Sequence, residues 1–263
     1  MFCQLEYLRH CLRQRIRRAL DELPETLDET YDRTLEEIGK KDWEYARRLF
    51  RCVAAASRPL RVEELAESLA FDFDAESTPT FREDWREEDP ERAVLSTCSS
   101  LLVIADKHDS PVIQFTHFSV KEYLMSKRLA EAKPTISRFH VSMTLAHTIV
   151  AQACLSALLH INENITGSDL QRFPLAEYTA EHWVGHARFE NVSRNIQDGM
   201  RCLFDPNHRH LSVWIWIYDP KSGRGRYGRP ERPSQASVIP LHYTACCGLR
   251  DVSSSSSSTA CKT

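Results

Sequence analysis

Apolar residues recur along most of the chain at steps of three and four positions, with polar residues between them. That spacing puts them on one face of a helix, so the pattern predicts amphipathic helices. Thr26 and Glu29 have the spacing of a capping box, and Asp42 and Pro90 suit helix starts. Helices are therefore expected over residues 5–23, 27–38, 43–54, 62–69, 90–97, 136–161, 174–189 and 192–203, the last capped by Asn191.

The stretch 101–131 departs from this periodicity. Residues 101–104 form an apolar run, residues 106–111 have turn chemistry, and residues 112–116 alternate between apolar and polar side chains. This pattern predicts a β-hairpin. A helix should follow at once, because Ser119 and Glu122 have capping-box spacing and Phe118 can pack on Tyr123 as a hydrophobic staple.

His117 occupies the joint between the second strand of this hairpin and the helix. Free backbone N–H groups and the helix dipole favour an anion at such a place, and an imidazole there can donate a hydrogen bond to a phosphate. The alternative is a half-buried histidine bonded to a neighbouring carbonyl group. The residue pattern leaves both interpretations open.

Composition places the chain among soluble globular proteins and favours helices. Of 263 residues, 42% are hydrophobic and 27% are charged, and the net charge of −3 gives no general attraction to nucleic acid or acidic membranes. Nine cysteines without a CxxC pair, behind a charged N-terminus without a signal sequence, predict reduced thiols in a cytoplasmic protein. The longest apolar run, 149–161, is expected to be too short and too polar to span a bilayer.

Several segments of the chain resemble one family. The sequence at 115–124, FTHFSVKEYL, is similar to the His-containing motif that closes the winged-helix domain of NACHT and related STAND nucleotide-switch ATPases. Three further segments resemble the surroundings of that motif in fungal NLR-like proteins that carry ankyrin repeats behind a NACHT module. They are ALDELPETLDETYDRTLEEI at 19–38, PLRVEELAESLA at 59–70 and FPLAEYTAEHWVGHARFE at 173–190.

The resemblance implies a mainly α fold. It places the end of the NACHT-associated helical region at 1–41, a winged-helix domain with a β-hairpin wing at 42–131, a helical spacer domain at 132–218 and a linker at 219–237. It also favours a helix over 211–218, where the pattern permits strand or helix. In the family the motif histidine contacts the phosphates of bound ADP and helps to hold the resting state. His117 is the matching position, so the resemblance implies a nucleotide-sensing role for it.

The segment PLHYTA at 240–245 resembles the opening of an ankyrin repeat, whose signature includes TPLHxA. The motif positions are Pro240, Leu241, His242, Ala245 and Gly248, and in such repeats the histidine usually hydrogen-bonds the turn. A truncated repeat is expected over 238–252, followed by a disordered serine-rich tail at 253–263.

Catalytic motifs are not apparent in the sequence. It contains no GxxxxGK[ST] phosphate loop, so ATPase activity and a resident nucleotide are not expected. The GxGxxG at 223–228 precedes a proline instead of opening a helix. His182 and His186 stand one helical turn apart but lack a third ligand, so no metal site is expected.

Together these patterns predict a non-catalytic regulatory fragment of a fungal NACHT–ankyrin signal-transduction protein. It would meet ADP or ATP only when joined to a NACHT core, and its partners would be that core or other proteins, not nucleic acid or membrane. A freestanding protein-binding adaptor is the alternative. A DNA-binding regulator is less favoured, because Glu63, Glu64 and Glu67 lie where a groove-reading helix needs basic or amide side chains.

Overall fold

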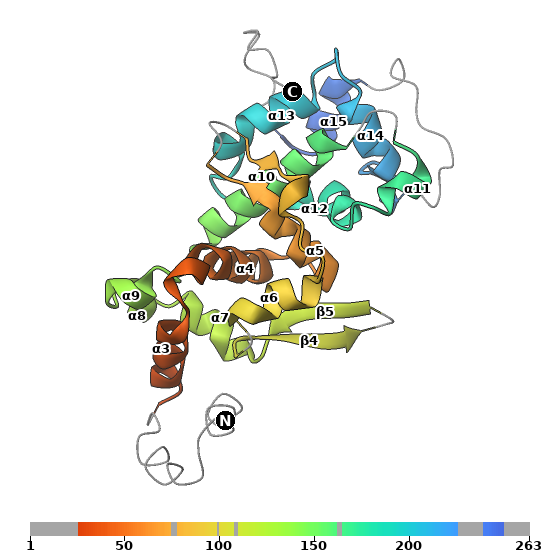
Figure 1. Cartoon of the computed structure of the whole chain (residues 1–263). Coiled ribbons are helices and arrows are strands. Elements are labelled where there is room, and N and C mark those ends of the chain that lie inside the picture. Colours follow the sequence, from red (N-terminus) through yellow and green to blue (C-terminus); the bar gives the residue numbers. More distant parts are fainter. Residues whose placement is uncertain are drawn as a thin grey trace.

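The computed structural model describes residues 26–74, 78–98, 100–107, 110–161, 165–225 and 239–249. Over these residues the chain is mainly helical with small antiparallel sheets. It forms two stacked parts, a lower part with a projecting β-hairpin and an upper layer of helices (Figure 1). The predicted helix at 5–23 and the serine-rich tail at 253–263 lie outside the described residues.

The lower part has the order of helices and strands expected of a winged helix. Its helices are α3 (Leu27–Glu37), α4 (Trp43–Ala55), α5 (Val62–Glu67), α6 (Pro90–Cys98) and α7 (Phe118–Leu124). Its short elements are the 3₁₀ turns η2 (Lys40–Asp42), η3 (Ser68–Ala70) and η4 (Glu83–Trp85) and the strand pair β2 (Phe71–Asp72) and β3 (Thr80–Phe81). The wing is the antiparallel sheet of β1 (Leu60–Arg61), β5 (Ser110–Phe115) and β4 (Leu102–Lys107), in that order.

The register of the sheet explains the apolar pattern of the hairpin. Leu60 of β1 and Ile104 of β4 both stand opposite Ile113 of β5, which is almost fully buried. Phe50 of α4 packs against the sheet, and its ring centroid is 6.4 Å from that of Phe115. The alternation along β5 therefore directs one row of side chains onto α4.

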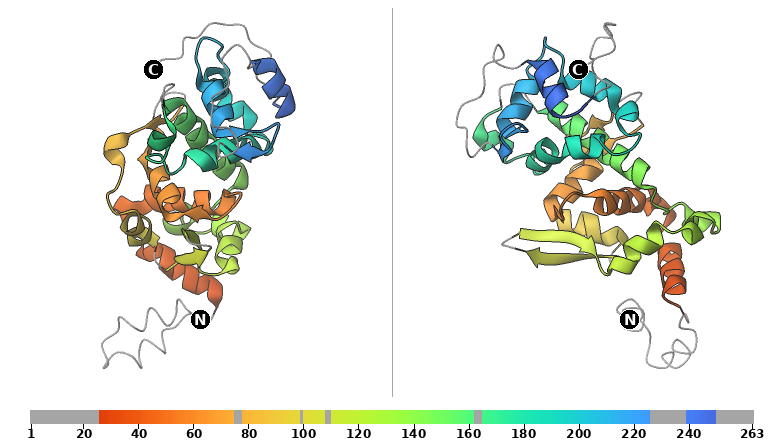
Figure 2. Two further views of the ribbon diagram at one scale, coloured as in Figure 1. Left: turned by 90° about the vertical axis from the view of Figure 1, so that its right-hand side faces the viewer. Right: turned by 180° about the vertical axis from the view of Figure 1, so that it is seen from behind.

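The upper layer is built around one long helix, α10 (Met143–His160), which packs on α4 below it and on α12 (Ala176–Ala187) within the layer. Helices α8 (Lys127–Ala130) and α9 (Pro134–Ser137) connect the two parts and lie beside α7 and α3 of the lower part (Figure 1). The other elements of the upper layer are α11 (Gly167–Leu170), η5 (Ser193–Ile196), α13 (Gln197–Leu203), α14 (His210–Ile217), β6 (Tyr218–Asp219), β7 (Arg224–Gly225) and α15 (Pro240–Cys246). Helices α3 and α15 lie at opposite ends of the molecule (Figure 2).

Helix α10 is long and apolar enough to cross a membrane by length and composition, with 18 residues at a mean hydropathy of 1.3. Half of it is buried inside the protein. Its contacts with α4, α12 and α13 account for that apolar character, because a helix enclosed on several sides needs no polar face.

Two tryptophans anchor the upper layer. Trp183 of α12 and Trp214 of α14 are fully buried and meet edge to face, with ring centroids 5.2 Å apart. The Trp214 indole N–H donates to the carbonyl oxygen of Ala180 at 2.8 Å. The segment 210–217 is thus a helix, as the family resemblance favoured, and the buried indole keeps its hydrogen bond.

The structure corrects two expectations about helix ends and one about cysteines. The predicted helix over 136–161 is broken, because the Val141 amide bonds the carbonyl oxygen of Leu124 at 2.8 Å between α9 and α10. Asn191 does not cap a helix; it has a φ of 63° and precedes η5. Cys202 is disulfide-bonded, whereas Cys52 and Cys154 are buried free thiols, so only part of the cysteine prediction holds.

Candidate functional site

His117 lies in the turn between β5 and α7, and its side chain is exposed. A backbone hydrogen bond fixes the start of this turn, because the amide of Thr116 donates to the carbonyl oxygen of Leu101 at 3.0 Å. His117 is itself the N-cap of α7, with extended backbone angles of φ −152° and ψ 151°. The predicted capping box that starts at Ser119 is therefore wrong, because the helix begins two residues earlier and histidine takes the capping role.

The imidazole of His117 is held by one ring nitrogen. Its Nδ1 accepts the Ser119 amide at 3.2 Å and lies 2.7 Å from the Ser119 hydroxyl oxygen. The Tyr31 hydroxyl of α3 lies 2.8 Å from the same serine oxygen. Because Nδ1 accepts from the amide, the neutral ring carries its proton on Nε2. Among the described residues that Nε2 has no hydrogen-bond partner, so the ring presents one N–H donor to the surface.

Two of the backbone N–H groups at this helix start are already bonded within the turn. The Ser119 amide is bonded to His117 Nδ1, and the Val120 amide donates to the His117 carbonyl oxygen at 3.1 Å. Phe118 does not pack as a staple. It is 69% exposed, and its ring centroid lies 4.3 Å from that of His117. The site is thus a single outward N–H donor beside an exposed aromatic ring.

Helix α3 fixes the position of α7 from the N-terminal side. Tyr31 packs on Tyr123 with ring centroids 5.2 Å apart, and the Tyr123 hydroxyl bonds the carboxylate of Asp32. Burial and that carboxylate both raise the pKa of Tyr123 above its ordinary value. Arg128 forms ion pairs with Asp28 at 2.6 Å and with Asp32 at 2.8 Å. These contacts join α3, α7 and α8 around the base of the site.

Helix α7 also contacts α4, close to a histidine pair in which His147 is half-buried and His186 is buried. Lys121 Nζ donates to the carbonyl oxygen of Ala54 at 2.8 Å. Burial lowers the pKa of the nearby His147, and the charge of Lys121 lowers it further. His147 Nδ1 lies 2.8 Å from His186 Nδ1, so this pair joins α10 to α12.

Hydrogen bonds connect the histidine pair to the loop after α4. His186 Nε2 lies 2.9 Å from the hydroxyl of Tyr178, which also accepts the Ser57 amide at 3.1 Å. Burial lowers the pKa of His186 to about 3, with His147 and His182 contributing. His182, one helical turn before His186, packs on the Tyr178 ring, with centroids 4.8 Å apart. No group of three His, Cys, Asp or Glu side chains in the described ranges could hold a metal ion.

The predicted ankyrin motif falls on α15, which begins with Pro240 at its first turn. His242 Nδ1 lies 3.1 Å from Lys221 Nζ in the β6–β7 turn, so the His242 side chain contacts a lysine. Gly248 adopts a φ of 63°, which suits glycine after a helix end. Leu241 is 68% exposed and Ala245 is exposed as well. The described part of this end is a single helix, and it does not show an ankyrin repeat.

Sequence comparison agrees with the lower part of the structure. The family model described as GPI inositol-deacylase, winged helix domain matches residues 31–135. This match begins within α3, whereas the predicted domain began at 42. The chain therefore contains a winged-helix domain of this type, like those in fungal STAND proteins such as HET-E-1, followed by a helical layer.

Two curated fungal proteins are similar to the chain. The azaphilone pigments biosynthesis cluster protein L of Monascus ruber is 30% identical over 244 residues, which cover 88% of this chain and 50% of that protein. The vegetative incompatibility protein HET-E-1 of Podospora anserina is 23% identical over 217 residues, which cover 74% of this chain and 15% of that protein. The chain thus spans half or less of the length of these relatives. No solved structure matches the chain.

Proposed function

We propose that the chain is a non-catalytic regulatory arm of a fungal STAND-type signal-transduction protein. In this proposal a separate NACHT core holds ADP or ATP, and His117 donates a hydrogen bond to a phosphate of that nucleotide. The winged-helix match over residues 31–135 and the similarity to HET-E-1 support the class of protein. The FTHFSVKEYL motif supports the role of the histidine.

One observation carries the assignment to His117. Its Nδ1 is used by Ser119, so the remaining ring proton, on Nε2 of an exposed side chain, is available as a donor. A phosphate oxygen is a strong acceptor for such a donor, and the bond is charge-assisted. If the ring were buried, or if its Nε2 were bonded inside the domain, no N–H donor would be available to a nucleotide held by the NACHT core.

A protein-binding adaptor remains the second candidate, and the other end of the molecule favours it. Ile239 is 60% exposed and Leu241 is 68% exposed, at the start of α15. DNA binding has less support. Of the three acids on α5, only Glu63 is exposed, because Glu64 and Glu67 are buried and paired with arginines. The exposed residues of α6 include both Glu91 and Arg92, so that helix offers no basic face.

Titration of fluorescent ADP tests the proposal. The purified chain alone should show weak binding at most, and mixing it with a purified fungal NACHT core should tighten nucleotide binding by that core. His117→Ala should then reduce the gain by about tenfold or more, the value of one hydrogen bond to a charged group. His140→Ala is the matched control, since His140 is a half-buried histidine of the 138–142 connection, which bonds α7 at its last residue, Leu124, and not at the His117 end.

Three results would argue against this function. Hydrolysis of ATP by the chain alone would show that it is an enzyme. Equal binding by His117→Ala and the wild type would remove the histidine from the nucleotide site. Specific retardation of duplex DNA at physiological salt would favour the DNA-binding alternative.

A further inference from the structure

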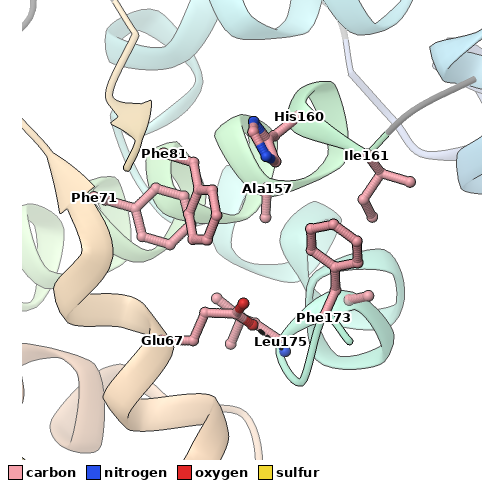
Figure 3. Close-up of a pocket in the computed structure, with 9 residues that line it drawn as sticks. Glu67, Phe71, Phe81, Ala157, His160, Ile161, Phe173 and Leu175 are labelled. Carbon is pink, nitrogen blue, oxygen red and sulfur yellow. Dashed lines mark hydrogen bonds between the residues drawn. The ribbon is translucent and has the colours of Figure 1, made fainter. Parts of the chain in front are cut away.

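A small aromatic pocket, with room for about one water molecule, lies at the seam between the winged-helix domain and the helical layer. Figure 3 shows Phe71 and Phe81 on one side of it and Phe173 on the other, with His160 above them. The carboxyl group of Glu67 closes the opposite edge and points toward Leu175. The walls thus come from β2, β3 and α5 of one part and from α10 and the segment before α12 of the other.

The chain already places a guanidinium group between two of these rings. The Arg86 Cζ atom lies 4.9 Å from the ring centroid of Phe81 and 5.2 Å from that of Phe173. The same guanidinium forms an ion pair with Glu67. A planar cation that stacks on aromatic faces and bonds a carboxylate is the arrangement in which arginine is favoured over lysine.

The carboxylate of Glu67 gives the pocket its preference for a cation. The side chain is only 6% exposed, and it accepts the Leu175 amide at 2.7 Å. Burial raises the pKa of Glu67, while the Leu175 amide and Arg86 act against that rise. A carboxylate buried to this extent is strongly destabilising when its cation is removed and nothing replaces it. An uncharged ligand of the same shape would leave the buried Glu67 carboxylate without a cation and would not offset this destabilisation.

The segment that delivers Arg86 reaches the pocket from the surface. The Arg86 side chain is 25% exposed, and the backbone around it holds few bonds, among them the Arg86 amide to Glu83 oxygen at 3.2 Å. The residues beside Arg86 in sequence are exposed and mostly acidic, and Glu83 lies 3.9 Å from the Arg86 guanidinium, so this segment forms an acidic rim beside it. These acids are Glu83, Asp84, Glu87, Glu88 and Asp89. A basic partner would be attracted to this rim.

We propose that this pocket is a binding site for the guanidinium side chain of a partner protein, and that Arg86 is its internal occupant in the free chain. An arginine from the partner replaces Arg86 between Phe81 and Phe173 and takes over its ion pair with Glu67. Because the two phenyl rings belong to different parts of the molecule, the replacement occurs where the winged-helix domain meets the helical layer. This site is separate from the one at His117 and does not depend on a nucleotide.

The first experiment empties the pocket and refills it with a small cation. Arg86→Ala should melt at a lower temperature than the wild type. Millimolar methylguanidinium should restore the melting temperature saturably, and N-methylurea, which is similar in shape but uncharged, should bind at least about tenfold more weakly. Glu67→Gln added to Arg86→Ala should abolish the recovery. Arg82→Ala is the matched control, because Arg82 is exposed, pairs with Asp84 and lies over Trp85 outside the pocket.

If methylguanidinium raises the melting temperature of Arg86→Ala no more than that of Arg82→Ala, the proposal is overturned. If Arg86→Ala does not fold, Arg86→Gln serves instead, since its amide can still bond Glu67.

The second experiment uses the wild-type chain and a blocked Gly-Arg-Gly peptide, with the citrulline peptide as the neutral control. Tryptophan fluorescence follows the exchange, because Trp85 is 43% exposed and directly precedes Arg86. A saturable change with the arginine peptide, lost in Trp85→Phe and in Glu67→Gln, is expected. The Arg86→Ala chain should bind the same peptide at least about tenfold more tightly, because its pocket has no internal competitor. Equal responses to the arginine and citrulline peptides would show that a partner's arginine does not displace Arg86.

Discussion

Mild acid should weaken the contact between α10 and α12 through the His147–His186 pair. The donors in this cluster form one chain. The Ser57 amide donates to the Tyr178 oxygen, the Tyr178 hydroxyl can donate to His186 Nε2, and His186 Nδ1 can donate to His147 Nδ1. A proton added to His186 puts an N–H on Nε2, the atom that accepts from the Tyr178 hydroxyl in the neutral ring. The Tyr178 hydroxyl can then no longer donate to it, and the chain of hydrogen bonds is disrupted. The cationic Lys121 close to His147 adds to the cost.

The magnitude follows from the pKa of His186. Its ordinary value is 6.5 and the fully buried side chain has a pKa of about 3 in the folded protein. The folded pKa lies below the unfolded pKa, so the contribution to stability is complete above the unfolded value and is lost as the pH falls toward about 3. Between about pH 7.5 and about pH 5 the free energy of unfolding should fall by about 2 kcal/mol from this group alone. The lowered pKa of His147 acts in the same direction.

Urea denaturation at the two pH values measures this loss. Other titrating groups contribute to the total, so the quantity of interest is the difference between the wild type and His186→Gln, which keeps a polar side chain but cannot titrate. That variant should lose about 2 kcal/mol less than the wild type on acidification. Thr148→Val, next to His147 on α10, removes a buried hydroxyl without changing a titratable group, so its cost should be equal at both pH values. A pH dependence that His186→Gln leaves unchanged would refute the reasoning.

Other substitutions test the packing around the candidate site by urea denaturation. Ser119→Ala removes the hydroxyl between Tyr31 and the capping ring and should cost about 1 kcal/mol of unfolding free energy. Trp214→Phe removes the indole N–H and part of a buried ring, and should cost about 2 kcal/mol or more. Arg58→Ala leaves the fully buried Glu64 with one remaining cation at 3.0 Å, and should cost about 3 kcal/mol; Glu64→Gln in that variant should recover part of the loss.

Local patterns were enough to predict the elements that build the winged helix. Thr26 caps α3 as its type and spacing indicated, because a capping hydroxyl needs only an amide three residues along. The hairpin followed from alternation that continues until Phe115. The position of His117 at the joint was likewise predictable, but its exposure was not, since exposure depends on which helices fold back over the turn. The distant Tyr31 decides how the ring is held.

Contacts between residues far apart in sequence were not predictable from the chain. His147 and His186 are 39 positions apart, and neither breaks the helical pattern around it. Glu67 looked like one of several surface acids, and only the fold reveals that Arg86 neutralises it and that the Leu175 amide bonds it from 108 positions away. The break between α9 and α10 is similar, because the bond from Val141 to Leu124 competes successfully with helix continuation. In each case a tertiary partner determines the local outcome.

The proposed regulatory role places one mechanical demand on the fold, and α7 meets it. The helix has only seven residues, yet it is attached on two sides, through Tyr123 to α3 and through Lys121 to α4. His117 is rigidly joined to its first turn because the ring itself is the cap. Rotation of the ring would break the cap, so a phosphate bonded to Nε2 in the proposed complex would be linked to the first turn of α7. The Tyr123 and Lys121 contacts then give α7 a direct connection to α3 and α4, which is what the proposed sensor role requires.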